Sequence, residues 1–95
     1  MIKHIVLFKL QEDQKDAVDT LVAKLRHLPE VIDLPQSFEV GKNVVSLAVN
    51  YDVALVSTFE SVDALMEYKN HPEHDRFVDY MRTVCEPVKA CDYEI

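Results

Sequence analysis

The chain has 95 residues, 48% of them hydrophobic, and its 17 acidic and 10 basic side chains give a net charge of −7. This length and composition predict one globular domain over residues 1–95, and no apolar run reaches the ~18 residues of a membrane span. An acidic surface repels phosphate backbones and the basic residues are scattered, so we expect neither nucleic acid nor a membrane as a partner.

A strand is predicted over residues 2–10, IKHIVLFKL, because β-branched and aromatic residues dominate this segment. The segment is too short, and its lysines are in the wrong places, for a signal peptide, so we expect a cytoplasmic protein. The even positions, which include His4, form the more apolar face, and we assign that face to the helices. Ile5 and Leu7 lie on the opposite face of the strand.

A helix is predicted from about Asp13, where the apolar period changes from that of a strand to that of a helix. Its apolar face consists of Val18, Leu21, Val22, Leu25 and Leu28. Pro29 and Pro35 are expected to bracket the end of this helix. The next segment, QSFEVGK, predicts a short strand that ends at Gly41.

A further strand is predicted over residues 50–59, NYDVALVSTF, and its alternation separates two sets of side chains. One face carries Tyr51, Val53, Leu55 and Phe59, and the other carries Ala54, Val56 and Thr58. Ser61 suits the cap of a following helix. The predicted core face of that helix consists of Val62, Leu65 and Met66, and its pattern stops near Asn70.

Pro72 suits the first position of another helix, because the N–H group that proline lacks would be unpaired there. This helix is predicted to end before Pro87 and to bury Phe77, Val78, Met81 and Val84. A last strand follows at residues 88–95, VKACDYEI. Its cysteine, Cys91, and the preceding Cys85 are too few for a disulfide framework, so we expect buried, reduced thiols rather than redox groups.

The predicted order β-α-β-β-α(α)-β is typical of the α+β ferredoxin-like sandwich, in which helices cover one face of a four-stranded antiparallel sheet. The other face is left without cover inside the chain. Ile5, Leu7 and one side of the 50–59 strand would lie bare there, and an apolar patch of that kind usually marks an association surface. We therefore expect a homodimer formed through the open face of the sheet.

Two histidines, His71 and His74, surround Pro72 in the segment EYKNHPEHDRF, and a metal site is one interpretation of this spacing. Proline disfavours helical geometry for the residue before it, which takes His71 off the helical face and places it at the cap. No third ligand is close in the sequence. We therefore expect no metal and no other cofactor.

Acid–base chemistry is a second interpretation, and it centres on His74. This residue shares a helical face with the apolar Phe77 and Met81, so that it points into the space between helices and sheet. His4 approaches the same space from the first strand, and Tyr68 approaches it from the preceding helix. A buried, neutral imidazole can accept a proton while a phenol polarises a carbonyl group. A purely structural histidine, packed near a helix start and hydrogen-bonded to the backbone, is the interpretation that the residues alone favour.

Four segments of the chain, IKHIVLFKL, SFEVGKN, YDVALVSTFESVDALMEYKNHPEHDRF and DYEI, resemble the Dabb family, the stress-responsive α/β-barrel domain. The resemblance covers essentially the whole chain and implies a ferredoxin-like protomer that forms a dimeric α+β barrel. The family includes plant stress-associated proteins and a polyketide cyclase of the olivetolic acid cyclase type, which performs an aldol condensation without metal.

By this resemblance, the working histidine and tyrosine of the cyclase match His74 and Tyr68, and its strand histidine matches His4. The chain departs from the cyclase at Val53, where the cyclase has a further histidine, and this thins the polar lining of the site. It also departs at residues 44–49, VVSLAV, which are more apolar than the corresponding loop of the family.

Two functions remain open. The first is a pocket for a small hydrophobic or carbonyl-containing molecule, with metal-independent acid–base chemistry by His74, Tyr68 and His4. The second is a non-enzymatic, stress-associated dimeric module that binds partners or serves a structural role. A cavity of about 300 Å³ or more beside His74 would favour the first, and a filled core would favour the second.

Overall fold

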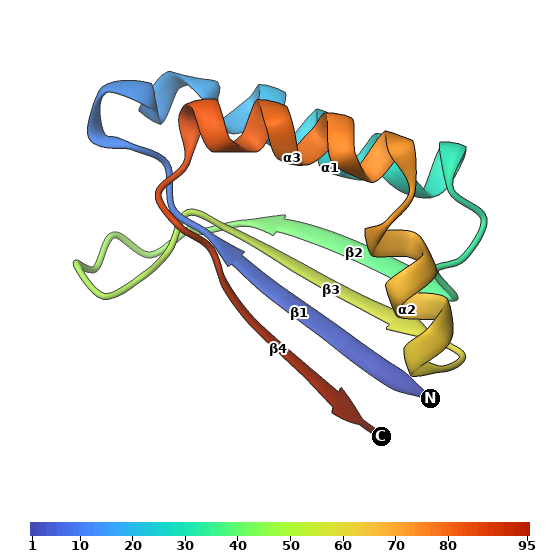
Figure 1. Ribbon diagram of the computed structural model, residues 1–95. Helices are drawn as coiled ribbons and strands as arrows, with labels where there is room; N and C mark the ends of the chain where they lie inside the picture. The colour runs from blue at the N-terminus through green and yellow to red at the C-terminus, as the bar shows by residue number, and fades with distance from the viewer.

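Four antiparallel strands and three α-helices form two layers in the computed structural model, which describes residues 1–95 (Figure 1). The elements are β1 (Ile2–Phe8), a 3₁₀ segment η1 (Glu12–Ala17), α1 (Val18–Val31), β2 (Ser37–Lys42), β3 (Val53–Phe59), α2 (Val62–Lys69), α3 (Pro72–Val84) and β4 (Lys89–Glu94). The strand order in the sheet is β2-β3-β1-β4. This confirms the predicted ferredoxin-like fold.

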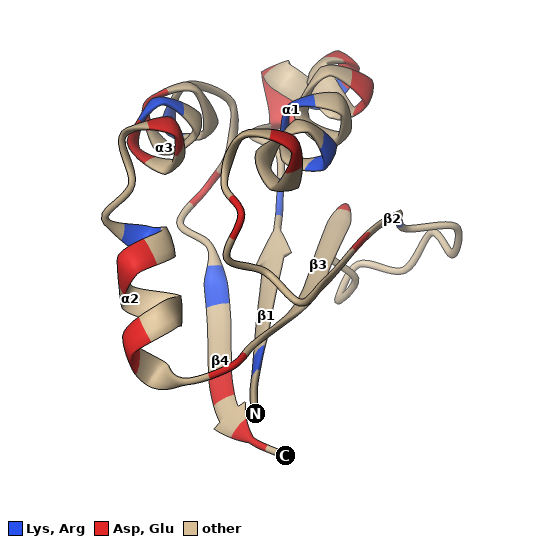
Figure 2. Ribbon diagram, turned by 90° about the vertical axis from the view of Figure 1, so that its right-hand side faces the viewer, with Lys and Arg blue, Asp and Glu red and all other residues tan.

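The helices cover one face of the sheet only. Helices α1 and α3 lie side by side across that face, and no element covers the other, as Figure 1 and the side view in Figure 2 show. The core lies between the two layers, and its most deeply buried side chains are Leu10, Leu21, Leu25, Phe59 and Tyr68. None of the helices has the length and apolar character needed to span a bilayer.

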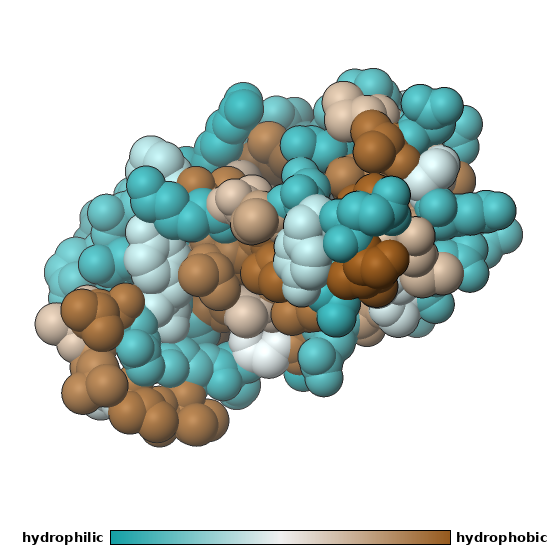
Figure 3. Space-filling model, turned by 90° about the horizontal axis from the view of Figure 1, so that it is seen from below, coloured by the Kyte–Doolittle hydropathy of each residue, from teal (hydrophilic) through white to brown (hydrophobic).

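The register of the strands defines the open face of the sheet. Ile5 lies opposite Val56 on β3 and Cys91 on β4, and Leu7 lies opposite Ala54 and Lys89 in the next row. Figure 3 views this face from below, with apolar residues near its middle and polar residues around them. Cys91 is exposed here, so the expectation that both cysteines are buried was wrong for this residue, whereas Cys85 is buried.

The predicted boundaries change at several places, and the strand predicted over residues 50–59 begins only at Val53. Strand β1 ends at Phe8, and the helix expected from Asp13 begins as η1, with a kink at Gln14, before α1 starts at Val18. Helix α1 also continues through Pro29 to Val31. Proline removes one helical hydrogen bond, but the next turn still closes, because the Ile32 N–H donates to Leu28 at 2.9 Å.

The predicted core face of α2 was wrong at two of three positions. Val62 and Met66 are 59% and 46% exposed, while Leu65 and Tyr68 are buried. The helix is only eight residues long, and the side that faces the sheet carries Leu65 and Tyr68 rather than Val62 and Met66. Its start was predicted correctly, since the Ser61 hydroxyl accepts a hydrogen bond from the Ala64 N–H at 3.1 Å.

Candidate functional site

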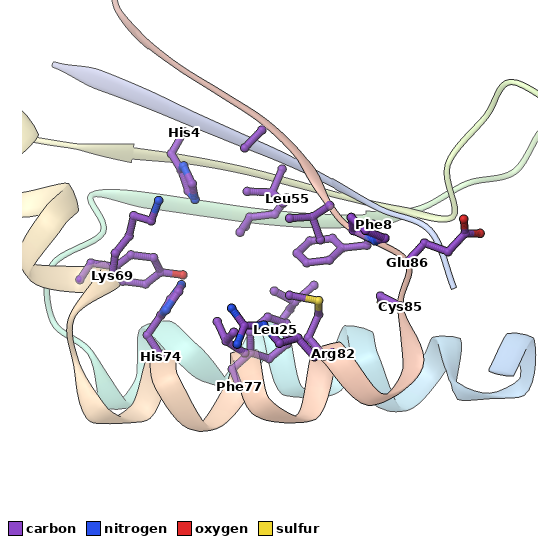
Figure 4. Close-up of a pocket in the computed structure, with 17 residues that line it drawn as sticks. His4, Phe8, Leu25, Leu55, Lys69, His74, Phe77, Arg82, Cys85 and Glu86 are labelled. Carbon is purple, nitrogen blue, oxygen red and sulfur yellow. The ribbon is translucent and has the colours of Figure 1, made fainter. Parts of the chain in front are cut away.

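A cavity of about 630 Å³ lies between α3 and the β1–β4 side of the sheet. Its middle is lined by apolar side chains, among them Phe8, Leu55 and Phe77, as Figure 4 shows. Two histidines, a tyrosine and a lysine line the end nearest α2: His4, His74, Tyr68 and Lys69. The structure therefore brings all three predicted site residues to one cavity, while their catalytic role stays a prediction.

The turn between α2 and α3 brings Tyr68 and His74 together. Tyr68 lies in the last turn of α2 and His74 in the first turn of α3, and their ring centroids are 4.8 Å apart at 67°. His71 caps α3, with its ring nitrogen Nδ1 accepting the Glu73 N–H at 3.0 Å, and Pro72 follows at the first helical position. The cap and the proline thus set the direction in which His74 leaves the helix.

His4 reaches the cavity from β1, and its ring centroid is 6.3 Å from that of Tyr68. The register places His4 opposite Asp92 on the edge strand β4, and His4 Nδ1 forms a hydrogen bond with the Asp92 carboxylate. When neutral, His4 donates from Nδ1 to this acceptor, which leaves Nε2 with the free lone pair. Asp92 was missed by the sequence analysis, because the pairing depends on strand register.

The imidazole of His74 is held in its neutral form. Burial lowers its pKa below the ordinary 6.5, and the positive charge of Lys69 lowers the pKa further, against a smaller opposing effect of Asp75. The ring points from α3 towards the sheet (Figure 4), and its buried Nδ1 has no hydrogen-bond partner. An unpaired buried nitrogen is uncommon in a folded protein. His74 itself lines the cavity, so part of its ring is open to a ligand.

Tyr68 supplies a hydrogen-bond donor beside the proton-accepting imidazole of His74. Burial strongly raises the pKa of its phenol, so that the hydroxyl stays protonated at neutral pH and can donate a hydrogen bond. Cys85 also lines the cavity, but burial raises the pKa of its thiol to about 11. A thiol of this kind is a poor nucleophile, because the thiolate is the reactive form.

Two cationic side chains, Lys69 and Arg82, line the cavity as well, and neither forms an ion pair within the chain. Neither side chain was predicted from the sequence to belong to the site. Lys69 directly follows Tyr68, and its ammonium end points towards His4 in Figure 4. No three His, Cys, Asp or Glu side chains are grouped so that they could hold a metal ion, and His71 uses Nδ1 as a cap.

Fold and site together define a ferredoxin-like α+β protein with a cavity of small-molecule size between its helices and its sheet. The model of the Stress responsive A/B Barrel Domain family, Dabb, matches residues 2–95, and the chain belongs to this family. It is 34% identical to an uncharacterised protein of Streptomyces coelicolor, over 99% of both chains. It is 28% identical to a stress-response A/B barrel domain-containing protein of Arabidopsis thaliana, over 98% of this chain and 88% of that protein.

Solved structures share the fold. A dimeric ferredoxin-like protein from Bacteroides fragilis is 30% identical, with a TM-score of 0.85 over 99% of this chain and 95% of that chain. A second dimeric ferredoxin-like protein, from Thermobifida fusca, is 25% identical, with a TM-score of 0.86 over 99% and 90% of the two chains. A hydroxynitrile lyase from Passiflora edulis has a TM-score of 0.85 over 99% and 92%, and at 20% identity this likeness shows the fold alone.

Proposed function

We propose that this chain binds a small apolar molecule with a carbonyl group and performs metal-independent acid–base chemistry on it. The observation that carries the proposal is the cavity of about 630 Å³ beside His74, which lies within the ~300–1,000 Å³ of small-molecule sites. A non-enzymatic module needs no such space, and its core would be filled. The cavity therefore favours the first of the two functions.

The chemistry follows from the protonation states of two neighbouring side chains. Neutral His74 accepts a proton from an acidic C–H beside the carbonyl, and the Tyr68 hydroxyl donates a hydrogen bond to the carbonyl oxygen as negative charge develops on it. The imidazolium then returns the proton to the same or another carbon atom. Lys69 adds positive charge at the same end of the cavity, where it favours the enolate.

We propose further that two copies associate through the open face of the sheet. This proposal is supported by the apolar row around Ile5, Val56 and Leu7, which nothing in the chain covers. It is also supported by the two solved relatives at 30% and 25% identity, which are dimeric. Dimerisation would bury this row and leave the cavity, on the helical side of the sheet, accessible.

The acid–base proposal is tested with 2-tetralone, an apolar ketone whose C1 protons lie between an aromatic ring and the carbonyl. In D₂O, proton removal and return exchange C1–H for C1–D, which NMR follows without any co-reactant. We expect exchange above the buffer rate with the wild type and with His27→Ala, an exposed histidine that does not line the cavity. We expect the buffer rate with His74→Ala. Equal rates for wild type and His74→Ala would overturn the proposal.

A further inference from the structure

The loop between β2 and β3 carries an unusual apolar segment, residues 44–49, which we call the apolar arm. Its large side chains are freely exposed: Val44 by 92%, Val45 by 52%, Leu47 by 58% and Val49 by 83%. Residues 43–51 contain no charged side chain, and the loop is neither blue nor red in Figure 2. Apolar exposure concentrated in one segment marks a surface that is covered by something else.

The apolar arm is held in shape by hydrogen bonds within the loop. Asn43 Nδ2 donates to the Val45 carbonyl at 2.8 Å, and Asn50 Nδ2 donates to the same carbonyl at 3.1 Å. The backbone N–H groups of Leu47 and Asn50 are also bonded inside the loop. The side-chain amides of the two asparagines thus bind the backbone inside the loop, while the apolar side chains face outward.

The base of the arm is fastened to the body of the protein through Asp52. Its carboxylate accepts the Leu10 N–H at 2.8 Å and the Lys15 ammonium at 3.0 Å, and its own N–H donates to Phe8. Partial burial would raise the pKa of Asp52, but these partners outweigh it and lower the pKa. The ionised carboxylate therefore anchors the arm, which limits the entropy that its ordering in a complex would cost.

The arm and the open face lie on the same side of the molecule. In Figure 1 the loop projects past the end of the sheet and down, away from the helices, and in Figure 3 it borders the open face. A hollow of about 410 Å³ lies where the two meet, and Leu7, Val49, Tyr51 and Ala54 contribute to its lining. One continuous surface thus presents an apolar projection next to an apolar hollow.

We propose that the apolar arm of each copy packs against the open face and hollow of a second copy of this chain. A twofold interface uses the same surface on both partners. The projection of each copy can therefore pack into the hollow of the other, so that the same contact forms twice. The inference rests on the homodimer proposed above and extends it. It assigns the arm, rather than the sheet alone, a share of the binding free energy.

The size of the sheet supports this assignment. Four strands about 4.8 Å apart and about six residues long give a face of about 400 Å² in projection, whereas each partner of a standard interface contributes about 800 Å² of accessible surface. Side-chain relief increases the accessible area of the face, and the arm adds a second apolar area beside it. Together they extend the surface towards the size of a stable interface.

A membrane is the competing occupant of an exposed apolar loop. Segments that lie on bilayers usually combine apolar side chains with lysine or arginine, which anionic headgroups attract. The apolar arm has no such residue, and the chain carries a net charge of −7. The charge of the chain therefore disfavours a bilayer as the occupant of the arm.

Sedimentation equilibrium of the full chain tests the proposal with the double variant Val44→Asp/Leu47→Asp. Its matched control is Val62→Asp/Met66→Asp, which places the same charges at exposed apolar positions of α2. We expect the arm variant to raise the dimer Kd about tenfold or more, and the control to leave the Kd unchanged. A photo-crosslinking benzophenone side chain at position 47 should give a dimer linked to a peptide that contains Leu7 or Ala54.

Three outcomes would overturn the inference, and they differ in whether the homodimer itself is also overturned. If the arm variant dimerises like the wild type while Leu7→Lys is monomeric, the arm is no contact and the homodimer stands. If the wild type is monomeric, the homodimer falls together with the arm. If the wild type, but not the arm variant, sediments with vesicles of phosphatidylcholine and phosphatidylserine, the occupant is a bilayer.

Discussion

Tyr68 and His74 meet edge to face, with ring centroids 4.8 Å apart, across the turn that joins α2 to α3. The contact places a phenol that stays protonated beside an imidazole that stays neutral, and burial is the main cause of both states. A hydrogen-bond donor and a proton acceptor are thus set side by side at one end of an otherwise apolar cavity.

Loss of His74 should affect chemistry more than folding. If its imidazole acts as the general base, His74→Ala should lower the rate of C1 exchange in 2-tetralone by about 10²–10⁴. The wild-type rate should rise with pH and level off near or below 6.5, since the pKa of His74 lies below that value in the folded chain. Rates measured between pH 4.5 and 8 check both points, and a rate that still rises above pH 6.5 would exclude His74 as the base.

His71 should contribute to stability and not to chemistry. His71→Ala removes the acceptor of the Glu73 N–H at the start of α3, and loss of a helix cap typically lowers the free energy of unfolding by about 1 kcal/mol. Urea denaturation measures this change. His71→Asn restores a capping acceptor and should recover most of the loss. An equal loss in both variants would mean that the cap contributes nothing.

The free energy of unfolding should depend on pH through His74. Above pH 6.5 the histidine is neutral in both states, and its environment costs nothing. As the pH falls below 6.5, the unfolded chain binds a proton before the folded chain does, so the free energy of unfolding decreases until the lowered pKa is reached. His74→Gln should lack this decrease. Denaturation of both proteins at pH 5 and 7.5 provides the comparison, and parallel curves would contradict it.

Leu7→Lys should dissociate the proposed homodimer, because it would place two charges in an apolar interface. Leu7 is 38% exposed on the open face and contributes little to the core of the chain. Sedimentation should therefore give the mass of a folded monomer at micromolar concentration. Val62→Lys, on α2, is the control and should remain dimeric. A dimeric Leu7→Lys protein would place the interface elsewhere.

Removal of metal ions should leave the protein unchanged. The chain has no cluster of three His, Cys, Asp or Glu side chains, and the Nδ1 atom of His71 already accepts a backbone hydrogen bond. Dialysis against EDTA should not alter the melting temperature measured by circular dichroism. A clear fall, reversed by added zinc, would support the metal interpretation of the histidine pair.

Much of this fold is predictable from local patterns, because its elements have sharp chemical signals. Ser61 and Pro72 mark the starts of α2 and α3, where a hydroxyl cap and a missing N–H are favoured. His4 and His74 could be assigned to the helix–sheet space because their neighbours on the same face are apolar. Each of these inferences needs only residues close in the sequence.

What could not be predicted depends on contacts between distant segments. The pairing of His4 with Asp92 requires the register of β1 against β4, and so does the exposure of Cys91. The inward stripe of α2 includes Tyr68 rather than Met66, because a helix of two turns takes its orientation from what it packs against. Helix propensity and hydrophobicity do not distinguish Tyr68 from Met66 at this position, since both side chains are largely apolar.

If the space beside His74 receives a small carbonyl compound, a crystal of the protein soaked with 2-tetralone should show electron density for the ligand in the cavity. The carbonyl oxygen should lie within hydrogen-bond distance of the Tyr68 hydroxyl, and C1 should lie next to the His74 ring. A structure in which Phe77 and Met81 fill the cavity, and no ligand density lies beside His74, would contradict this prediction.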